Sequence, residues 1–557
     1  MMTRKPRWKT VALVAAVAAL ALLVAACGGG GNKSAGGTTA TGGGGGGNQA
    51  FPLFRVTWDA PDYFDPGLSY TVTGWQIIQH VYLGAYGYKQ VGGPAGATVV
   101  PTLAEALPQI TNGAKNYKFT LREGLKYSDG SDVKASDFKA SIERLFKIDS
   151  PGVGFFTGIA GAEQFAKTKK GGISGIVTDD AKRTVEIKLT SPRGDFLNIL
   201  GIPFSAILPA GTPDKDQSTT PPPATGPYMI QSYKPTRSFV LVRNTEFDPS
   251  LVPSVYKGNP DKLEGTIIAE DAAALQSVLS GKSDYDFRTI PTDRLQTVKS
   301  KYSNQLRLYV PANTYYFAMN TRTPPFDKLQ VRQAVNYAID RNALVQLFGG
   351  LGKPTQNILP PTYPQYKKIT TYTHDLAKAK QLVKASGDAG MKVTVWGLNE
   401  SPSSKAVAYL ADVLNKIGFK TSQKLLAHDV YFTTIGNQAT KAQIMYTDWY
   451  QDYPHPLDWF DVLFNGNRIT QTHNNNVGNA DFPDVNKKIE ELKKVTSLTP
   501  QVNNEWAQID KDLVVKYASS AAYLNAVQTD FFGSNVDMNC YFNHVLFFFD
   551  WTKICLK

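Results

Sequence analysis

The chain has 557 residues, of which 42% are hydrophobic and 19% charged, and its formal net charge is +12. A disordered chain would have fewer apolar and more charged residues, and a protein with several membrane spans would need repeated apolar runs of about 20 residues. Only one apolar run comes near that length, so we expect a soluble globular protein with two or three domains.

Cysteine and histidine are scarce in this sequence. The three cysteines stand at positions 27, 540 and 555, and the chain has six histidines. This excludes a small domain held by disulfides and a cysteine-rich metal array, and it argues against a multi-histidine metal site. The lysines and arginines form no long runs, so we expect no nucleic-acid partner. We also expect no metal and no other cofactor.

The first 27 residues have the pattern of a lipoprotein signal peptide. Four cations precede an apolar run at 11–26, and no acidic residue lies among them. The run ends in Val-Ala-Ala-Cys at 24–27, and small residues before a cysteine resemble the lipobox of bacterial lipoproteins. We therefore predict lipidation at Cys27, with an uncleaved anchor helix as the alternative. Both place the rest of the chain outside the cytoplasm.

A glycine-rich tether is predicted at 28–50, where twelve of 23 residues are glycine. Such a segment buries no core and spans roughly 25 Å on average. We expect it to hold a folded body near the outer face of the cell membrane, through the lipid on Cys27. In that oxidising compartment Cys540 and Cys555 are predicted to form a disulfide, with two buried free thiols as the alternative.

The rest of the chain alternates predicted strands with predicted helices. Alternating apolar residues predict strands at 117–121 and 185–189, and further strands are predicted at 266–269, 284–287, 315–320, 393–396 and 444–446. Helical periodicity, with Ser or Asp at the start or Gly at the end, predicts helices that begin near 136, 272, 327, 375 and 406. This order predicts an α/β fold with mostly parallel sheets, whose ligands bind at the carboxyl ends of strands.

The loop at 447–459 follows the last of these strands and holds two Trp, two Tyr and three Asp. Aromatic rings offer a flat apolar surface, and a carboxylate among them can pair with an ammonium group away from water. The alternative is a core loop whose Asp residues cap backbone groups. No nucleophile with an adjacent base is present, so the loop is predicted to bind a ligand rather than to catalyse a reaction.

Four blocks of sequence, in the same order, resemble one known family. They are VPTLAE at 100–105 with YKFTLREGLKYSDG at 117–130, TGPY at 225–228 with RN at 243–244, FAMNT to VRQAVNYAIDR at 317–341, and WYQDYP at 449–454. The chain thus resembles the family 5 extracellular solute-binding proteins of ABC importers, the group that binds oligopeptides, dipeptides and nickel. The resemblance covers about residues 52–530.

The resemblance implies a two-lobed clamp, the type II periplasmic-binding-protein fold of cluster C. The first lobe would comprise residues 51–312, with an extra subdomain at about 91–221. The second lobe would comprise residues 313–512, and residues 513–557 would return to the first lobe. The ligand would lie buried between the two lobes.

The resemblance also implies the residues that bind the ligand. In peptide-binding members a Trp-x-x-Asp loop supplies the carboxylate that pairs with the α-ammonium of the peptide, and here Trp449 and Asp452 have that spacing. Tyr450 and Tyr315 are expected to line the cleft beside them, and Asp65 belongs to an early family block near the cleft mouth. No basic residue can be assigned to a ligand carboxylate.

We therefore expect a monomeric, lipid-anchored receptor that captures short peptides and delivers them to the permease of an ABC importer. One alternative keeps the fold and changes the ligand to a metal chelate or an oligosaccharide. Another alternative, an exported hydrolase, is disfavoured because the His-Glu-x-x-His and Gly-x-Ser-x-Gly motifs are absent from the sequence.

Overall fold

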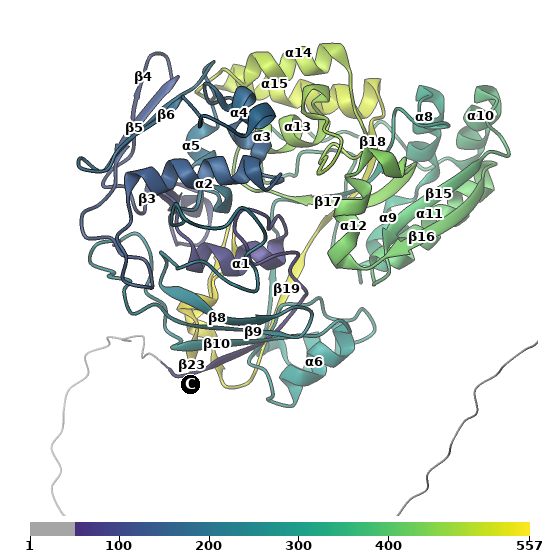
Figure 1. Cartoon of the computed structure of the whole chain (residues 1–557). Helices are drawn as coiled ribbons and strands as arrows, with labels where there is room; N and C mark the ends of the chain where they lie inside the picture. Colours follow the sequence, from purple (N-terminus) through teal and green to yellow (C-terminus); the bar gives the residue numbers. More distant parts are fainter. Residues whose placement is uncertain (1–50) are drawn as a thin grey trace, which may run out of the picture. The chain divides into compact units, whose positions relative to one another are not determined.

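The structure is a computed structural model in which residues 51–557 are described. The predicted signal peptide, Cys27 and the tether lie outside the described residues. Within them no helix is both long and apolar enough to cross a membrane. The described residues form a mixed α/β fold built on two large sheets, as Figure 1 shows.

The first large sheet has seven strands in the order β12-β19-β11-β1-β10-β9-β8. Their bounds are β1 Phe54–Trp58, β8 Tyr228–Lys234, β9 Ser238–Arg243, β10 Lys262–Ile267, β11 Tyr285–Asp286, β12 Leu306–Tyr309 and β19 Gln528–Phe532. Helix α1 (Val72–Val81) packs against β8, and α6 (Asp271–Leu279) packs against β1, β11 and β19. Helix α7 spans Leu295–Lys301.

The second large sheet has six strands in the order β14-β18-β13-β17-β15-β16. Their bounds are β13 Asn313–Met319, β14 Gly352–Pro354, β15 Lys392–Leu398, β16 Lys420–Leu426, β17 Ile444–Tyr450 and β18 Ser520–Ala526. The helices of this part are α8 Leu329–Ala338, α9 Arg341–Leu347, α10 Leu376–Ser386, α11 Ser403–Ile417, α12 His428–Ile435, α13 Pro456–Phe464, α14 Pro483–Leu492 and α15 Pro500–Lys511. Helix α11 packs on β15 and β16 (Figure 1).

A smaller antiparallel sheet has the strand order β4-β5-β7-β6. It consists of β4 Gln109–Thr111, β5 Asn116–Thr120, β6 Ile176–Asp179 and β7 Thr184–Lys188, with α2 (Ala135–Lys147) packed against β6 and β7. The short helices α3 Val153–Phe156, α4 Ala162–Thr168 and α5 Phe196–Ile199 lie in the same stretch of chain. Two-stranded pairs complete the fold: β2 Tyr86–Tyr88 with β3 Val99–Pro101, β20 Val536–Asp537 with β23 Cys555–Leu556, and β21 Asn543–His544 with β22 Phe548–Phe549.

The expectation of mostly parallel sheets is wrong. Strand β1 runs parallel to β10 and β11, and β15 runs parallel to β16 and β17, but the other pairs are antiparallel. The reason is chain connectivity, because β8, β9 and β10 follow one another through connections without a helix and fold back as neighbours. The predicted cap of α10 is confirmed: Asp375 accepts the backbone N–H of Lys378 at 2.8 Å, and Gly387 ends the helix with a φ of 81°.

The chain crosses between the two large sheets twice, and the crossings lie side by side. The first runs from β12 to β13, and the second runs from β18 to β19. Asn313 holds them together, since its side-chain amide donates to the Ala526 carbonyl at 2.9 Å and accepts from the Ala526 N–H at 2.7 Å. The chain was predicted to return to the first lobe at residue 513. It returns later, because β18 still pairs with β13 and β14 of the second sheet.

Cys540 and Cys555 form a disulfide near the C-terminus, with Cα atoms 5.7 Å apart. It closes a loop with a sequence separation of 15. A loop of this length loses enough entropy in the unfolded chain to stabilise the fold by about 3 kcal/mol. We expect the double variant C540S/C555S to have its free energy of unfolding in urea reduced by about that amount. An unchanged unfolding midpoint would show that the loop is already ordered in the unfolded state.

Candidate functional site

A cavity of about 440 Å³ lies between the two large sheets. One wall comes from segments of the first sheet and includes Asp59, Tyr70 and Arg288. The other wall comes from segments of the second sheet and includes Glu400 and the stretch 446–452. The volume is within the range of small-molecule sites, which also favour the junction of two packed units.

Asp452 lies just beyond the end of β17 and borders the cavity. Its side chain is buried, and one carboxylate oxygen accepts a 2.6 Å hydrogen bond from the Tyr70 hydroxyl of the opposite wall. Tyr70 also makes an edge-to-face contact with Trp449, with ring centroids 5.7 Å apart. Among the described residues no Lys or Arg forms an ion pair with Asp452. The carboxylate therefore has capacity for a cation from the cavity.

A second buried carboxyl group, that of Asp458 in α13, adjoins Asp452. It accepts the backbone N–H of Asp452 at 3.0 Å. Burial raises the pKa of Asp452 to about 7, and it raises the pKa of Asp458 well above the usual range. The negative charge of Asp452 adds to the shift of the Asp458 pKa. At neutral pH the pair therefore keeps a proton on Asp458, and a cation in the cavity would favour ionised Asp452.

The predicted aromatic residues gather at the same cavity. Tyr315 on β13 and Tyr450 on β17 join their hydroxyl groups at 2.7 Å. The antiparallel register of β13 and β17 brings them near each other, because it pairs Tyr315 with Asp448 and Asn313 with Tyr450. Trp449, Tyr450, Tyr315 and Asp452 all line the cavity, so the structure brings these four predicted residues together.

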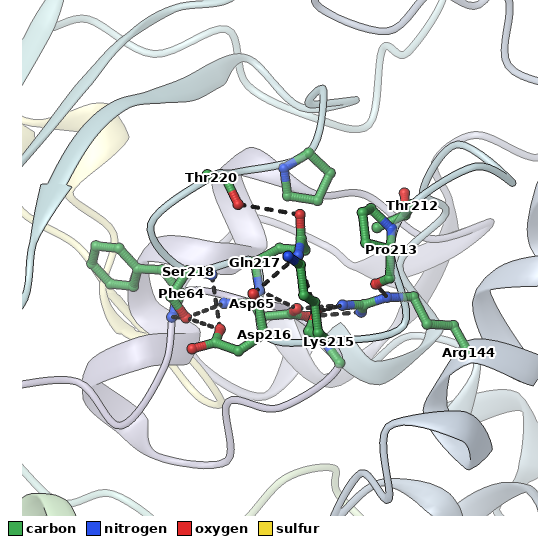
Figure 2. A network of polar contacts seen from close by, with 12 residues as sticks. Phe64, Asp65, Arg144, Thr212, Pro213, Lys215, Asp216, Gln217, Ser218 and Thr220 are labelled. Carbon is green, nitrogen blue, oxygen red and sulfur yellow. Dashed lines mark hydrogen bonds and ion pairs between the residues drawn. The ribbon is translucent and has the colours of Figure 1, made fainter.

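Asp65 does not reach the cavity, and the expectation that it binds ligand is corrected. Figure 2 shows its carboxylate within a buried polar network. Arg144 donates to the two oxygens of Asp65 at 2.9 and 2.5 Å, and the backbone N–H groups of Gly67 and Gln217 donate at 2.8 and 2.9 Å. The carboxylate is therefore fully occupied by the protein itself, and its role is to compensate the charge of the buried Arg144.

A charged cluster at the cavity wall was missed from the sequence. Arg288 follows β11 and forms ion pairs with Asp59 and Asp271 at 2.7 Å each, both from the first-sheet side. It also reaches Glu400 of the opposite wall at 3.4 Å. The position directly after a strand was the signal that could have identified Arg288, because α/β sheets place functional groups there.

The same cluster offers three ligand atoms of the kind that bind metals. Those of Asp59, Glu400 and His428 lie within 4.8 Å of one another. Arg288 already pairs with both carboxylates, so little negative charge remains for a metal ion. Its contact with Glu400 and the Tyr70–Asp452 hydrogen bond both join opposite walls, so the structure shows the walls of the cleft in contact.

Comparison with known proteins agrees with this geometry. The model of the family "Bacterial extracellular solute-binding proteins, family 5 Middle" matches residues 98–471. The glutathione-binding proteins GsiB of Salmonella typhi and Escherichia coli O157:H7 are both 26% identical to this chain, over 350 and 360 residues. These matches cover 61% and 62% of this chain and 64% and 65% of the relatives, so the chain spans just under two thirds of their length.

Solved structures show the same fold. The clavulanic acid biosynthesis oligopeptide binding protein 2 is similar with a TM-score of 0.80 and 23% identity, covering 92% of this chain and 96% of that one. The Escherichia coli murein tripeptide binding protein MppA has a TM-score of 0.78 and 20% identity, with 92% and 99% coverage. These likenesses confirm the predicted fold class, that of the cluster C binding proteins.

Proposed function

This chain belongs to family 5 of the bacterial extracellular solute-binding proteins, and we propose that it captures short peptides in the cleft between its two sheets. The family comprises non-enzymatic binding proteins of ABC importers, so the chain is a binding protein and not a hydrolase. The observation that carries the peptide proposal is Asp452, a buried carboxylate at the cavity with no basic partner among the described residues.

A peptide fits the chemistry of this cavity. Its α-ammonium can pair with Asp452, and the exclusion of water strengthens that pair. Its side chains can lie against the rings of Trp449, Tyr450 and Tyr315. Strand ends at 447–451 and 526–529 border the cavity as well, and their backbone groups can hold an extended peptide as an added strand.

Binding is proposed to close the cleft around the ligand. The two side-by-side crossings near Asn313 and Ala526 are the connections about which the two halves would turn. Tyr70 and Asp452 come from opposite walls, so a ligand at Asp452 contacts both halves only in the closed state. That differential contact is what shifts the population towards closure and presents the closed form to the permease.

Thermal unfolding with three classes of ligand tests this function. Trialanine, a malto-oligosaccharide and a nickel chelate represent the peptide proposal and the two non-peptide alternatives. A ligand present at about 100 times its Kd stabilises the folded state by about 2.7 kcal/mol. We expect trialanine alone to raise the melting temperature. A rise with the sugar or the chelate and none with trialanine would refute the peptide assignment.

Peptide affinity is expected to depend on pH through Asp452. The ionised carboxylate binds the ammonium, and its pKa is raised to about 7, so protons compete with the ligand below that pH. We expect Kd to increase about tenfold per pH unit from pH 6 to pH 5, and to increase again above about pH 8, where the peptide amine loses its proton. Calorimetric titration across this range measures the increase of Kd at low pH and at high pH. In the variant D452N the increase at low pH is expected to disappear. An unchanged increase at low pH in D452N would assign it to another group.

We further propose that the mature protein is a monomer held at the outer face of the cell membrane. The sequence pattern at 11–27 and the tether at 28–50 support the membrane location. Intact-mass measurement of membrane-extracted protein would show the lipid on Cys27, and the variant C27S would lack it.

A further inference from the structure

The cavity is acidic, although the chain as a whole is basic. Eight acidic side chains line it: Asp59, Asp62, Asp271, Glu400, Asp429, Asp448, Asp452 and Asp530. Against them stand one arginine, Arg288, and no lysine among the described residues that form the wall. The formal net charge of the chain is +12, so the excess of acids is a local property of this cavity.

Most of these acids already have partners within the protein. Arg288 pairs with Asp59, Asp271 and Glu400. Asp62 accepts from Ser69, Tyr70 and Thr71, while Asp530 accepts from the hydroxyl groups of Tyr285 and Tyr541. Asp429 is exposed at the start of α12. Of the remaining two acids, Asp452 accepts a hydrogen bond from the Tyr70 hydroxyl, and neither Asp452 nor Asp448 has a Lys or Arg partner among the described residues.

Apart from the exposed Asp429, Asp448 is the cavity acid whose side chain makes no hydrogen bond or ion pair within the described residues. It lies on β17 opposite Tyr315 and borders the cavity. The rings of Tyr315, Tyr446 and Tyr450 border the cavity with it. Burial raises the pKa of Asp448 to about 6, so the carboxylate is mostly ionised at neutral pH. An ionised carboxylate without a Lys or Arg partner, among aromatic rings and with His428 as its neighbouring basic residue, is a site for a cation.

We infer that the ligand is a short peptide with a basic side chain, Arg or Lys, which binds Asp448 while the α-ammonium binds Asp452. This inference rests on the proposed function. The Cα atoms of two residues four apart in an extended chain are at most about 13 Å from each other. The α-ammonium of a peptide and the side-chain cation of its first or second residue can reach two carboxylates at that separation. Guanidinium groups also stack well on tyrosine rings, which favours Arg.

The charged groups of the cavity wall also disfavour ligands that carry more carboxylates than ammonium groups. Arg288 is the one arginine of the described cavity wall, and three carboxylates already surround it. Glutathione has two carboxylates and one ammonium group, and the wall offers no free Lys or Arg for either carboxylate. The named function of the GsiB relatives therefore does not transfer to this cavity on charge.

Matched peptides with and without the cation test the inference. We choose the pairs Arg-Ala-Ala with Met-Ala-Ala and Ala-Arg-Ala with Ala-Met-Ala, because Met is an uncharged residue with a long unbranched side chain. Calorimetry with the full chain is expected to give a Kd at least tenfold lower for the Arg peptide in one or both pairs. Glutathione is expected to bind at least tenfold more weakly than the better Arg peptide.

Two variants assign the preference to a residue. D448N is expected to remove the difference between the Arg and Met peptides, whereas D429N, which removes an exposed acid of the same cavity wall, is expected to keep it. A melting temperature of D448N near that of the parent shows that the variant is folded. If D448N does not fold, the comparison of these two variants is replaced by titrating the parent protein with Arg-Ala-Ala and with its citrulline analogue, which lacks the charge. The citrulline peptide must then bind at least tenfold more weakly.

The outcomes distinguish failure of the proposed function from failure of this inference. If none of the four peptides binds, the proposed function fails and this inference fails with it. If the Arg and Met peptides bind equally, the proposed function stands and this inference is overturned. A preference for Arg that survives in D448N, or glutathione binding as tight as that of the Arg peptides, would also overturn it.

Discussion

Replacing Asp452 by alanine is expected to raise the Kd of trialanine by about 30-fold to several thousand-fold, which corresponds to about 2–5 kcal/mol. The reason is that the α-ammonium of the peptide would lie in a water-excluded cavity with no countercharge. Tyr70 would not compensate, since a tyrosine hydroxyl carries no charge at neutral pH. Isothermal calorimetry with the parent and the variant measures this change.

Asp458 provides the matched control for Asp452. It is also buried and adjoins Asp452, but its raised pKa keeps it protonated, so D458N replaces a neutral group by a neutral group of the same shape. We expect D458N to lose far less affinity than D452A. Equal losses in the two variants, or no loss in D452A, would contradict the assignment of the ammonium to Asp452.

Replacing Asp65 by alanine is expected to lower the free energy of unfolding by about 3–5 kcal/mol. The change leaves the charge of Arg144 buried without compensation, because this arginine side chain is only 4% exposed and Asp65 is fully buried. Peptide affinity is expected to stay unchanged, since Asp65 does not border the cavity. Urea unfolding and calorimetry measure the two properties separately.

An exposed ion pair of the same length tests whether burial is the cause of the stability loss expected in D65A. Lys126 and Asp132 lie 2.5 Å apart, as Arg144 and Asp65 do, but their side chains are 41% and 67% exposed. We expect D132A to change stability little, because water replaces the lost partner. A loss in D132A as large as that in D65A, or weakened peptide binding in D65A, would refute this explanation.

The sequence was informative where local pattern determines structure. The alternation at 117–121 predicted a strand that corresponds to β5, a strand predicted at 315–320 corresponds to β13, and Asp375 with Gly387 predicted the ends of α10. The ends of α10 and the alternation of β5 depend on neighbouring residues alone. The aromatic loop was expected to begin at residue 447, but β17 continues to Tyr450 and α13 begins at Pro456, so Asp452 lies in a short connection between them. Asp452 was proposed as a site residue from the Trp-x-x-Asp spacing of the resemblance.

Features that depend on distant partners could not be predicted in this way. Strand β18 was expected to belong to the return to the first lobe, but it pairs with β13 and β14 of the second sheet. Asp65 was expected at the cleft from its family block, and its pairing with Arg144, which lies 79 positions away, could not be read from the sequence. The contact between Tyr70 and Asp452 spans 382 positions and exists only because the two halves face each other.

The charge of the cavity wall could likewise not be predicted from the sequence. The sequence gives no sign that the acids of a basic chain gather at one site, because Asp59, Glu400 and Asp448 come from separate segments. Nor does it indicate that Arg288 is already taken by three carboxylates. The ligand class is therefore a property of the folded arrangement, while the family and the fold class could be recognised from sequence blocks.

The central claim is that Asp452 pairs with the α-ammonium of a peptide, and a four-way comparison of affinities tests it most directly. Trialanine and N-acetyl-trialanine, which lacks the ammonium, are titrated by calorimetry into the parent protein and into D452N. We predict that acetylation weakens binding to the parent at least tenfold and has a much smaller effect in D452N, because both changes remove the same interaction. Equal affinity of the parent for the two peptides, or the same loss on acetylation in both proteins, would contradict the claim.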